Sequence, residues 1–211
     1  MAKESLSPNE CRDMLLAVAD KIIESEPILT DADRALGDGD HGIGMERGMN
    51  AVKEKLAGTD FDSIDKPFTT MGMAMMSSMG GASGAVFGTL FRAGGKALAE
   101  AESLGAEQVA AFFSAAAEGV QKRGGAKPGD KTMVDALVPA AEKAEEVKGE
   151  SLATSIAAVA EAAEAGKKAS EDMIATMGRA KTLGERSLGK PDAGAVSVSI
   201  IVATMSAYVA E

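Results

Sequence analysis

The sequence predicts an all-α protein: a single domain over residues 1–211, folded as an eight-helix antiparallel bundle. Aromatic residues make up only 3% of the chain and Trp is absent, so Ala, Met, Leu and short β-branched side chains must fill the core. That mixture favours close-packed helices over sheets. Apolar residues also recur three and four positions apart along most of the chain. The length suffices for one sizeable core, and no linker divides it.

The charge balance excludes two classes of partner. The net charge is −10 at pH 7, which argues against nucleic acid and against anionic membrane surfaces, since both select Lys and Arg. The chain has no apolar run of about 18 residues, and its first ten residues lack the apolar core of a signal peptide. The single Cys11 cannot form an internal disulfide and reads as a small buried helix residue. We therefore expect a cytoplasmic protein.

The first helix is expected over residues 8–25. Ser7 is a typical N-cap, Pro8 suits the first turn, and Glu10 completes a capping box. Its apolar residues then recur at helical spacing: Cys11, Met14, Leu15, Val18 and Ile22.

Seven further helices follow from the same periodicity, at about 43–57, 62–77, 84–102, 106–122, 132–147, 151–176 and 194–210. Pro139 is expected to kink the sixth helix or to end its first section. The last segment, "AGAVSVSIIVATMSAYV", is rich in β-branched residues. Its length and the lack of a partner strand favour a buried helix.

The connections between these helices fall into two groups. If neighbouring helices are antiparallel, one end of the bundle collects "DADRALGDGDHG", "SSMGGASG", "RGGAKPGDKT" and "GRAKTLGERSLGKPDAG". Each is rich in glycine and leads into a helix N-terminus, an arrangement that suits phosphate. Acidic residues beside phosphate require a divalent cation between them. The sequence therefore predicts a metal–phosphate or metal–nucleotide site at the end of the bundle where these four loops meet. The connections at the opposite end are ordinary solvated turns.

The acidic loop "LGDGDHGIGM" supplies the candidate metal ligands, Asp33, Asp38 and Asp40. Mg²⁺ prefers oxygen ligands and shares them with substrate phosphates, and three carboxylates suggest two ions bridging a polyphosphate. The loop lacks the calcium spacing of an EF-hand. Zinc and hydroxyl–His–Asp catalysis are disfavoured because His41 is the single His of the chain. The alternative is that these aspartates only cap helices and turns.

The other loops offer weaker candidates. "SSMGGASG" lacks the Lys of a Walker motif, so a phosphate clamp and close helix packing explain it equally well. Lys131 is either a phosphate partner or a solvated lysine. Arg179 and Arg186 are better candidates for anion contacts, because a guanidinium matches phosphate geometry. Asp192 is a nucleotide or metal-shell residue, or a helix cap.

Four stretches together, "GDGDHG", "SSMGGASG", "PGDKTM" and "GERSLGKPDAGA", resemble the signature loops of the nucleotide-binding L subunit of dihydroxyacetone kinase. The resemblance covers essentially the whole chain. It implies an eight-helix barrel with ADP or ATP at one rim, and Asp33, Asp38 and Asp40 holding two Mg²⁺ ions. It also implies these nucleotide contacts: His41, Gly42, Ile43, Gly44, Ser77, Ser78, Gly124, Met133, Arg179, Asp192, Ala193 and Gly194. Gly44 departs from several relatives, which have Asn there.

The resemblance implies a kinase that is active only with a partner. In this family the keto-sugar is held covalently by a histidine of a separate K subunit. The phosphoryl donor is either free ATP or bound ADP recharged by a phosphohistidine protein of the phosphotransferase system, and the sugar is dihydroxyacetone or a relative such as erythrulose. Two alternatives remain: the nucleotide module of a fatty-acid-type kinase, and a non-catalytic nucleotide- or metal-dependent regulator.

Overall fold

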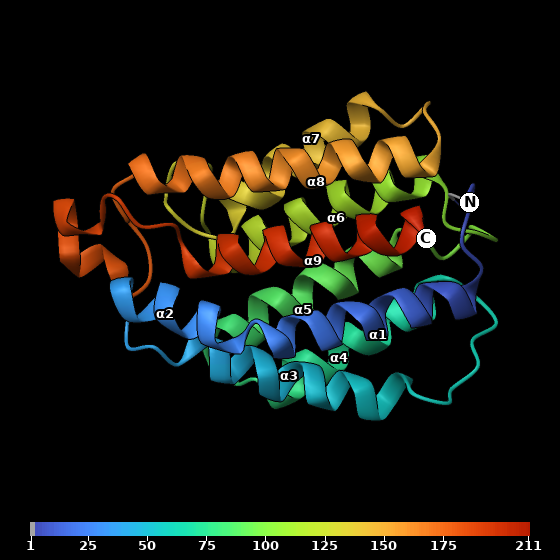
Figure 1. Ribbon diagram of the computed structural model, residues 1–211, viewed down its shortest axis with the longest axis horizontal. Helices are drawn as coiled ribbons and strands as arrows, with labels where there is room; N and C mark the ends of the chain where they lie inside the picture. The colour runs from blue at the N-terminus through green and yellow to red at the C-terminus, as the bar shows by residue number, and fades with distance from the viewer. Residues whose placement is uncertain (1–2) are drawn as a thin grey trace.

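A computed structural model describes residues 3–211 and confirms the all-α class. Within these residues there are nine α-helices, two 3₁₀ segments and no strand (Figure 1). Their bounds are α1 (Pro8–Glu24), α2 (Glu26–Leu36), α3 (His41–Leu56), α4 (Asp65–Ser78), α5 (Gly81–Lys96), α6 (Ala106–Gly124), α7 (Val134–Glu146), α8 (Leu152–Ala169), η1 (Ser170–Asp172), η2 (Ala180–Ser187) and α9 (Ala193–Ala210).

Eight of these helices close into the predicted antiparallel barrel. From α3 to α9 each helix packs against the next along the chain, while α1 packs against both α3 and α9 and so completes the ring. The described chain begins and ends at the same end of the barrel (Figure 1, right). The opposite end carries α2 and η2, which contact each other.

Helix α2 corrects the sequence interpretation, which treated residues 26–42 as a link. Pro27 lies in its first turn, where the missing N–H costs nothing. Leu29 and Leu36 are buried, and the helix packs against α3 and α9. The segment is therefore a short ninth helix that fixes the approach to the acidic loop.

Two other boundaries differ from expectation. The helix expected to reach residue 176 ends as α8 at Ala169. Helix α7 continues through Pro139 instead of ending there. Pro139 has no N–H to offer the Asp135 carbonyl, and Gly166 of α8 packs against that oxygen. A Cβ on Gly166 would lie 2.1 Å from it, so the proline and the glycine together allow α7 and α8 to approach closely.

The barrel interior is packed mainly by Met, Leu, Val and Ala, with one aromatic cluster. The ring of Phe112 lies 4.9 Å from that of Phe68, 5.2 Å from Phe113 and 6.2 Å from Phe91, centroid to centroid. Among the described helices, α9 alone is long and apolar enough to cross a membrane, and 56% of it is buried inside the protein. It packs between α1 and α8, as the predicted buried helix should.

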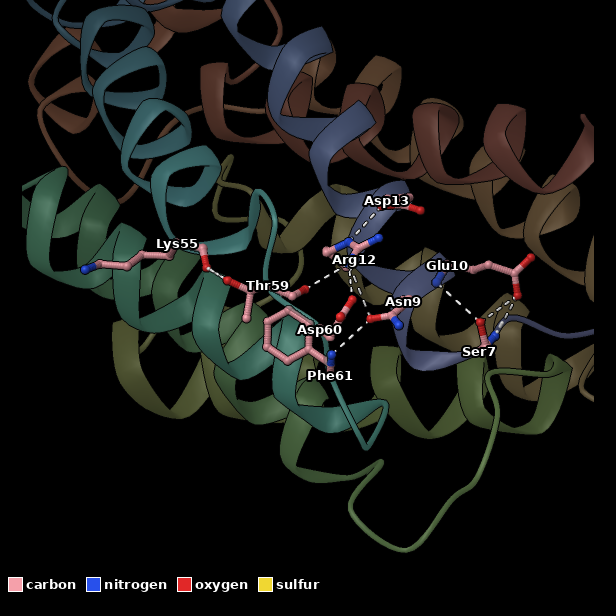
Figure 2. A network of polar contacts seen from close by, with 9 residues as sticks. All are labelled: Ser7, Asn9, Glu10, Arg12, Asp13, Lys55, Thr59, Asp60 and Phe61. Atoms are coloured by element: carbon pink, nitrogen blue, oxygen red, sulfur yellow. Dashed lines mark hydrogen bonds and ion pairs between the residues drawn. The ribbon is translucent and has the colours of Figure 1, made fainter.

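The predicted capping box at the start of α1 is present. The Ser7 hydroxyl oxygen accepts from the Glu10 backbone N–H at 3.4 Å, and the Glu10 carboxylate accepts from the Ser7 N–H at 2.9 Å (Figure 2). Two free N–H groups of the helix terminus are thereby satisfied.

The link between α3 and α4 is tied to α1 rather than left as a free turn. Arg12 donates to the Thr59 carbonyl at 2.9 Å and to the Asp60 carboxylate at 3.2 Å (Figure 2). Asn9 accepts from the Phe61 N–H at 2.9 Å. These bonds fix the end of the barrel that lies away from the predicted site.

Candidate functional site

The four predicted loops meet around one cavity of about 820 Å³. Its lining comes from four stretches of chain, within 33–47, 79–87, 120–134 and 177–194. These stretches include the N-terminal turns of α3, α5, α7 and α9. The cavity therefore lies where helix dipoles and unpaired N–H groups favour an anion.

Three carboxylates gather at the edge of this cavity. Asp33, Asp38 and Asp40 each offer an oxygen, and these oxygens all lie within 4.8 Å of one another. Asp40 occupies the N-cap position of α3, yet its carboxylate makes no capping bond, so it is free for another partner. An all-oxygen set of this kind fits Mg²⁺.

The backbone of the acidic loop is shaped to bring these groups together. Asp33 accepts from the His41 N–H at 3.2 Å, which ties the end of α2 to the start of α3. A Cβ on Gly37 would lie 2.6 Å from an Asp33 carboxylate oxygen, so a larger residue here would displace the Asp33 side chain. Gly39 has φ +77°, a left-handed conformation that glycine adopts without strain. Asp38 forms an ion pair with Arg179.

His41 lies buried in the cavity wall. Its Nε2 is 2.8 Å from the Ser197 hydroxyl, and that hydroxyl donates to the Ala193 carbonyl at 3.2 Å, so it accepts from Nε2–H. Burial lowers the pKa of His41, although Asp33 opposes the shift. The imidazole is therefore neutral at pH 7. Ser197 lies on α9, and nothing in the helical periodicity of the sequence singles it out.

The second loop lines the cavity with residues other than the expected serines. Ser77 and Ser78 both donate to the Ala74 carbonyl, at 3.0 and 2.6 Å, and neither lines the cavity. The start of α5 does so instead, through Gly80, Gly81, Ala82 and Ser83. Gly80 and Gly81 have φ +74° and +60°. The backbone at the N-terminus of α5 is therefore in a left-handed conformation that favours glycine.

Lys131 in the third loop is buried rather than solvated, and it also lines the cavity. It is 2% exposed, and its ammonium donates to the carbonyls of Ser170 and Lys190 at 2.5 and 2.6 Å. Gly124 and Met133 line the cavity beside it.

The fourth loop contributes Arg179 and Asp192. Arg186 does not line the cavity, and its Nε donates within its own segment, to the Leu183 carbonyl. Asp192 caps α9, accepting from the Ala195 N–H at 2.8 Å, and it also lines the cavity. Burial raises the pKa of Asp192 to about 7, and the nearby Asp135 carboxylate adds to the shift. The helix-cap interpretation of Asp192 is thus confirmed, and its contact with a nucleotide or metal stays a prediction.

Most of the residues predicted from sequence line the cavity. They are Asp33, Asp38, Asp40, His41, Ile43, Gly44, Gly124, Met133, Arg179, Asp192, Ala193 and Gly194. Gly42 does not, because it packs against α2 beside Thr30. Arg47 is a lining residue that the sequence analysis missed, and it donates to the Met79 carbonyl at 2.6 Å. Helical spacing from Gly44 would have placed Arg47 on the same face of α3.

The fold and the cavity define a helical barrel with a candidate metal–nucleotide site at one rim. The sequence matches the DAK2 domain family over residues 35–207. The chain therefore belongs to the DAK2 domain family, which confirms the resemblance described above.

Relatives of known activity are similar along nearly their whole length. The chain is 38% identical to the ADP-binding subunit DhaL of the PEP-dependent dihydroxyacetone kinase of Escherichia coli K12, over 94% of this chain and 95% of that protein. It is 35% identical to the corresponding subunit of the PTS-dependent enzyme of Lactococcus lactis, over 90% and 92%. The dihydroxyacetone kinase of C. freundii, solved with AMP-PNP and Mg²⁺, shares the fold with a TM-score of 0.74 at 23% identity, over 98% of this chain and 36% of that one.

Proposed function

We propose that this chain is the nucleotide-binding subunit of a dihydroxyacetone-type kinase. One observation carries the proposal: Asp33, Asp38 and Asp40 converge at a cavity that Arg179 also lines. The near full-length similarity to ADP-binding subunits supports the same assignment. The reaction is transfer of a phosphoryl group from a nucleotide to a hydroxyl of a short keto-sugar.

In this proposal the three aspartates hold two Mg²⁺ ions, which when bound neutralise phosphate charge. The chain itself supplies positioning and further positive potential. Arg179 binds phosphate oxygens through its guanidinium, and the N-termini of α3, α5 and α9 present backbone N–H groups to the same anion.

The sugar is proposed to come from a separate K-type subunit. A keto-sugar can be held covalently by a histidine, but the single His of this chain, His41, is buried and bonded to Ser197. The His41 side chain is therefore not available to hold the sugar, and we propose that a partner presents the acceptor.

The donor is proposed to be a nucleotide that stays bound: ADP is recharged to ATP on the chain, and ATP returns to ADP when it phosphorylates the sugar. The relatives that match along nearly their whole length are named as PEP-dependent or PTS-dependent. We therefore propose that ADP stays on the chain and is recharged by a phosphohistidine protein of the phosphotransferase system. This cycle takes place in the cytoplasm.

Nucleotide content tests the proposal first. The purified protein is denatured, and the supernatant is separated by anion-exchange chromatography. Near-stoichiometric ADP is expected, and kinase activity should appear only after a K-type subunit is added. An empty site with ATP-supported activity would overturn the donor assignment. A non-catalytic regulator would bind nucleotide without giving activity with any sugar-binding partner.

A further inference from the structure

Lys131 is a buried cation whose hydrogen bonds lie away from the acidic loop. Its side chain is 2% exposed, and two of its three N–H donors reach the carbonyls of Ser170 and Lys190. Ser170 is the C-cap of α8, where a helix presents free carbonyls and a partial negative charge. Burial lowers the pKa of Lys131, although the nearby carboxylates oppose the shift, Asp192 most and then Glu171 and Asp135.

These two carbonyls lie beside the base of one segment, residues 173–192, which we call the arginine segment because it carries Arg179. Ser170 comes just before the segment, and Lys190 lies near its end. Its ends are tied together by further bonds. The Asp192 N–H donates to the Ser170 hydroxyl at 3.0 Å, and the Gly189 N–H donates to the Glu171 carbonyl at 2.8 Å. The segment is thus a closed loop with a narrow base, and the Lys131 ammonium lies at that base.

The loop that carries Lys131 is built to direct the side chain inward. Lys131 has φ +59° and is the one non-glycine residue with positive φ in the described part of the chain. This conformation is held from both sides, because the Asp135 carboxylate accepts from the Gly129 and Thr132 N–H groups at 2.6 and 2.7 Å. A strained backbone that its surroundings fix so firmly is typical of functional positions.

We propose that Lys131 is a positioning residue that clamps the base of the arginine segment and thereby holds Arg179 and Asp192 in place for the nucleotide. The segment contributes both residues to the cavity wall, and its outer part is attached by the Thr176 hydroxyl, which donates to Asp130 at 2.5 Å. Asp130 is the neighbour of Lys131, so a single short loop secures the segment at two points. This inference rests on the proposed nucleotide site and adds that Lys131 holds the arginine segment in position at that site.

The experiment compares the nucleotide-free wild type with Lys131→Met, which keeps the length of the side chain and removes the donors. Hydrogen exchange is measured along the whole chain, and MgADP binding by calorimetry. We expect faster exchange in residues 173–192 with no change in α6. If the segment is in place only a tenth of the time, the apparent Kd for MgADP rises about tenfold.

The matched control is Lys190→Ala. It removes a neighbouring lysine side chain that is exposed and keeps the carbonyl that Lys131 contacts, so exchange and affinity should both match the wild type. Should Lys131→Met not fold, Ser170→Ala removes the hydroxyl that accepts from Asp192 at the same base, and it should loosen the same segment.

Unchanged exchange in residues 173–192 would overturn the clamp, whether or not the Kd rises. Faster exchange with an unchanged Kd would equally overturn the link to nucleotide binding. If the wild type does not bind MgADP, the proposed function fails, and the exchange data still decide whether Lys131 holds the segment.

Discussion

Arg179 and Asp38 form an ion pair across the mouth of the cavity. Arg179 comes from the arginine segment, and Asp38 from the acidic loop between α2 and α3. Both side chains are well exposed, at 68% and 42%, so the pair contributes little to the stability of the fold. Its consequence is functional: a carboxylate proposed to hold a metal ion is neutralised by the cation proposed to hold phosphate.

Replacing Arg179 by Gln should therefore change two affinities in opposite directions. Mg²⁺ alone should bind the nucleotide-free variant more tightly than the wild type, because Asp38 no longer has a competing cation. MgADP should bind more weakly, by about tenfold or more, since a charge-assisted phosphate contact is lost. Calorimetric titration of each ligand measures both effects.

Arg186→Gln provides the matched control for charge. It removes an arginine from the same segment that does not line the cavity, so both affinities should stay at the wild-type values. A weaker Mg²⁺ affinity in Arg179→Gln, or equal effects of the two variants, would contradict the proposed competition.

The acidic loop gives the most direct test of the metal site. Asp38→Asn and Asp40→Asn should each lower kinase activity in the presence of the partner subunit about a hundredfold or more, because phosphate charge is no longer neutralised. The far-ultraviolet circular dichroism should not change, since neither side chain supports the helical core. Asp31→Asn is the control: its carboxylate is exposed and pairs only with Arg34 on the surface of α2. Wild-type activity in either test variant would refute the metal site.

Composition and periodicity were sufficient for the helical bundle because most of its eight long helices bury one apolar stripe, while α9 is apolar and buried around much of its surface. They were not sufficient for α2. Its buried residues, Leu29, Thr30 and Leu36, form a short stripe beside the acidic and glycine-rich stretch that marks a loop. Composition and periodicity also did not predict that α8 ends at Ala169. The next residue, Ser170, forms hydrogen bonds with Lys131 and Asp192, which lie far away in the sequence.

The site shows the same division between local and distant information. The residue types in the loops predicted that the three aspartates and Arg179 lie at one site. Their position at the same end of the bundle followed from the antiparallel order of the helices, which determines which loops meet. Helix-terminal detail was harder to predict: the Ser77 and Ser78 hydroxyls bond within α4, so the chain lines the cavity with the first turn of α5 instead. Whether Lys131 is solvated or buried depends on a positive φ angle that no sequence pattern predicts.

Two glycines in the first turn of α3 should respond differently to a methyl group. A Cβ on Gly42 would lie 2.3 Å from the Thr30 hydroxyl oxygen and 2.5 Å from the Glu26 carbonyl, so Gly42→Ala forces α2 away from α3. We expect a loss of about 1–3 kcal/mol in the free energy of unfolding. A Cβ on Gly44 meets nothing within 4 Å, and Gly44→Ala should leave stability unchanged or raise it by up to about 1 kcal/mol. Urea unfolding of both variants measures the difference, and equal stability would show that α2 does not pack as described.

Asp192 gives a prediction about pH. Burial raises the pKa of Asp192 from 3.8 to about 7 in the folded protein, so ionisation is harder when the chain is folded. The contribution of this group to stability is therefore complete below about pH 4, and it is lost as the pH rises through 7.

Asp192→Asn keeps a good N-cap and removes the ionisation. Relative to the wild type, the variant should gain stability between pH 4 and pH 8, on the order of 2 kcal/mol given the partial exposure of the carboxylate. Urea unfolding of the nucleotide-free proteins at several pH values measures this gain. A difference that does not change with pH would mean that Asp192 ionises as freely in the folded state as in the unfolded one.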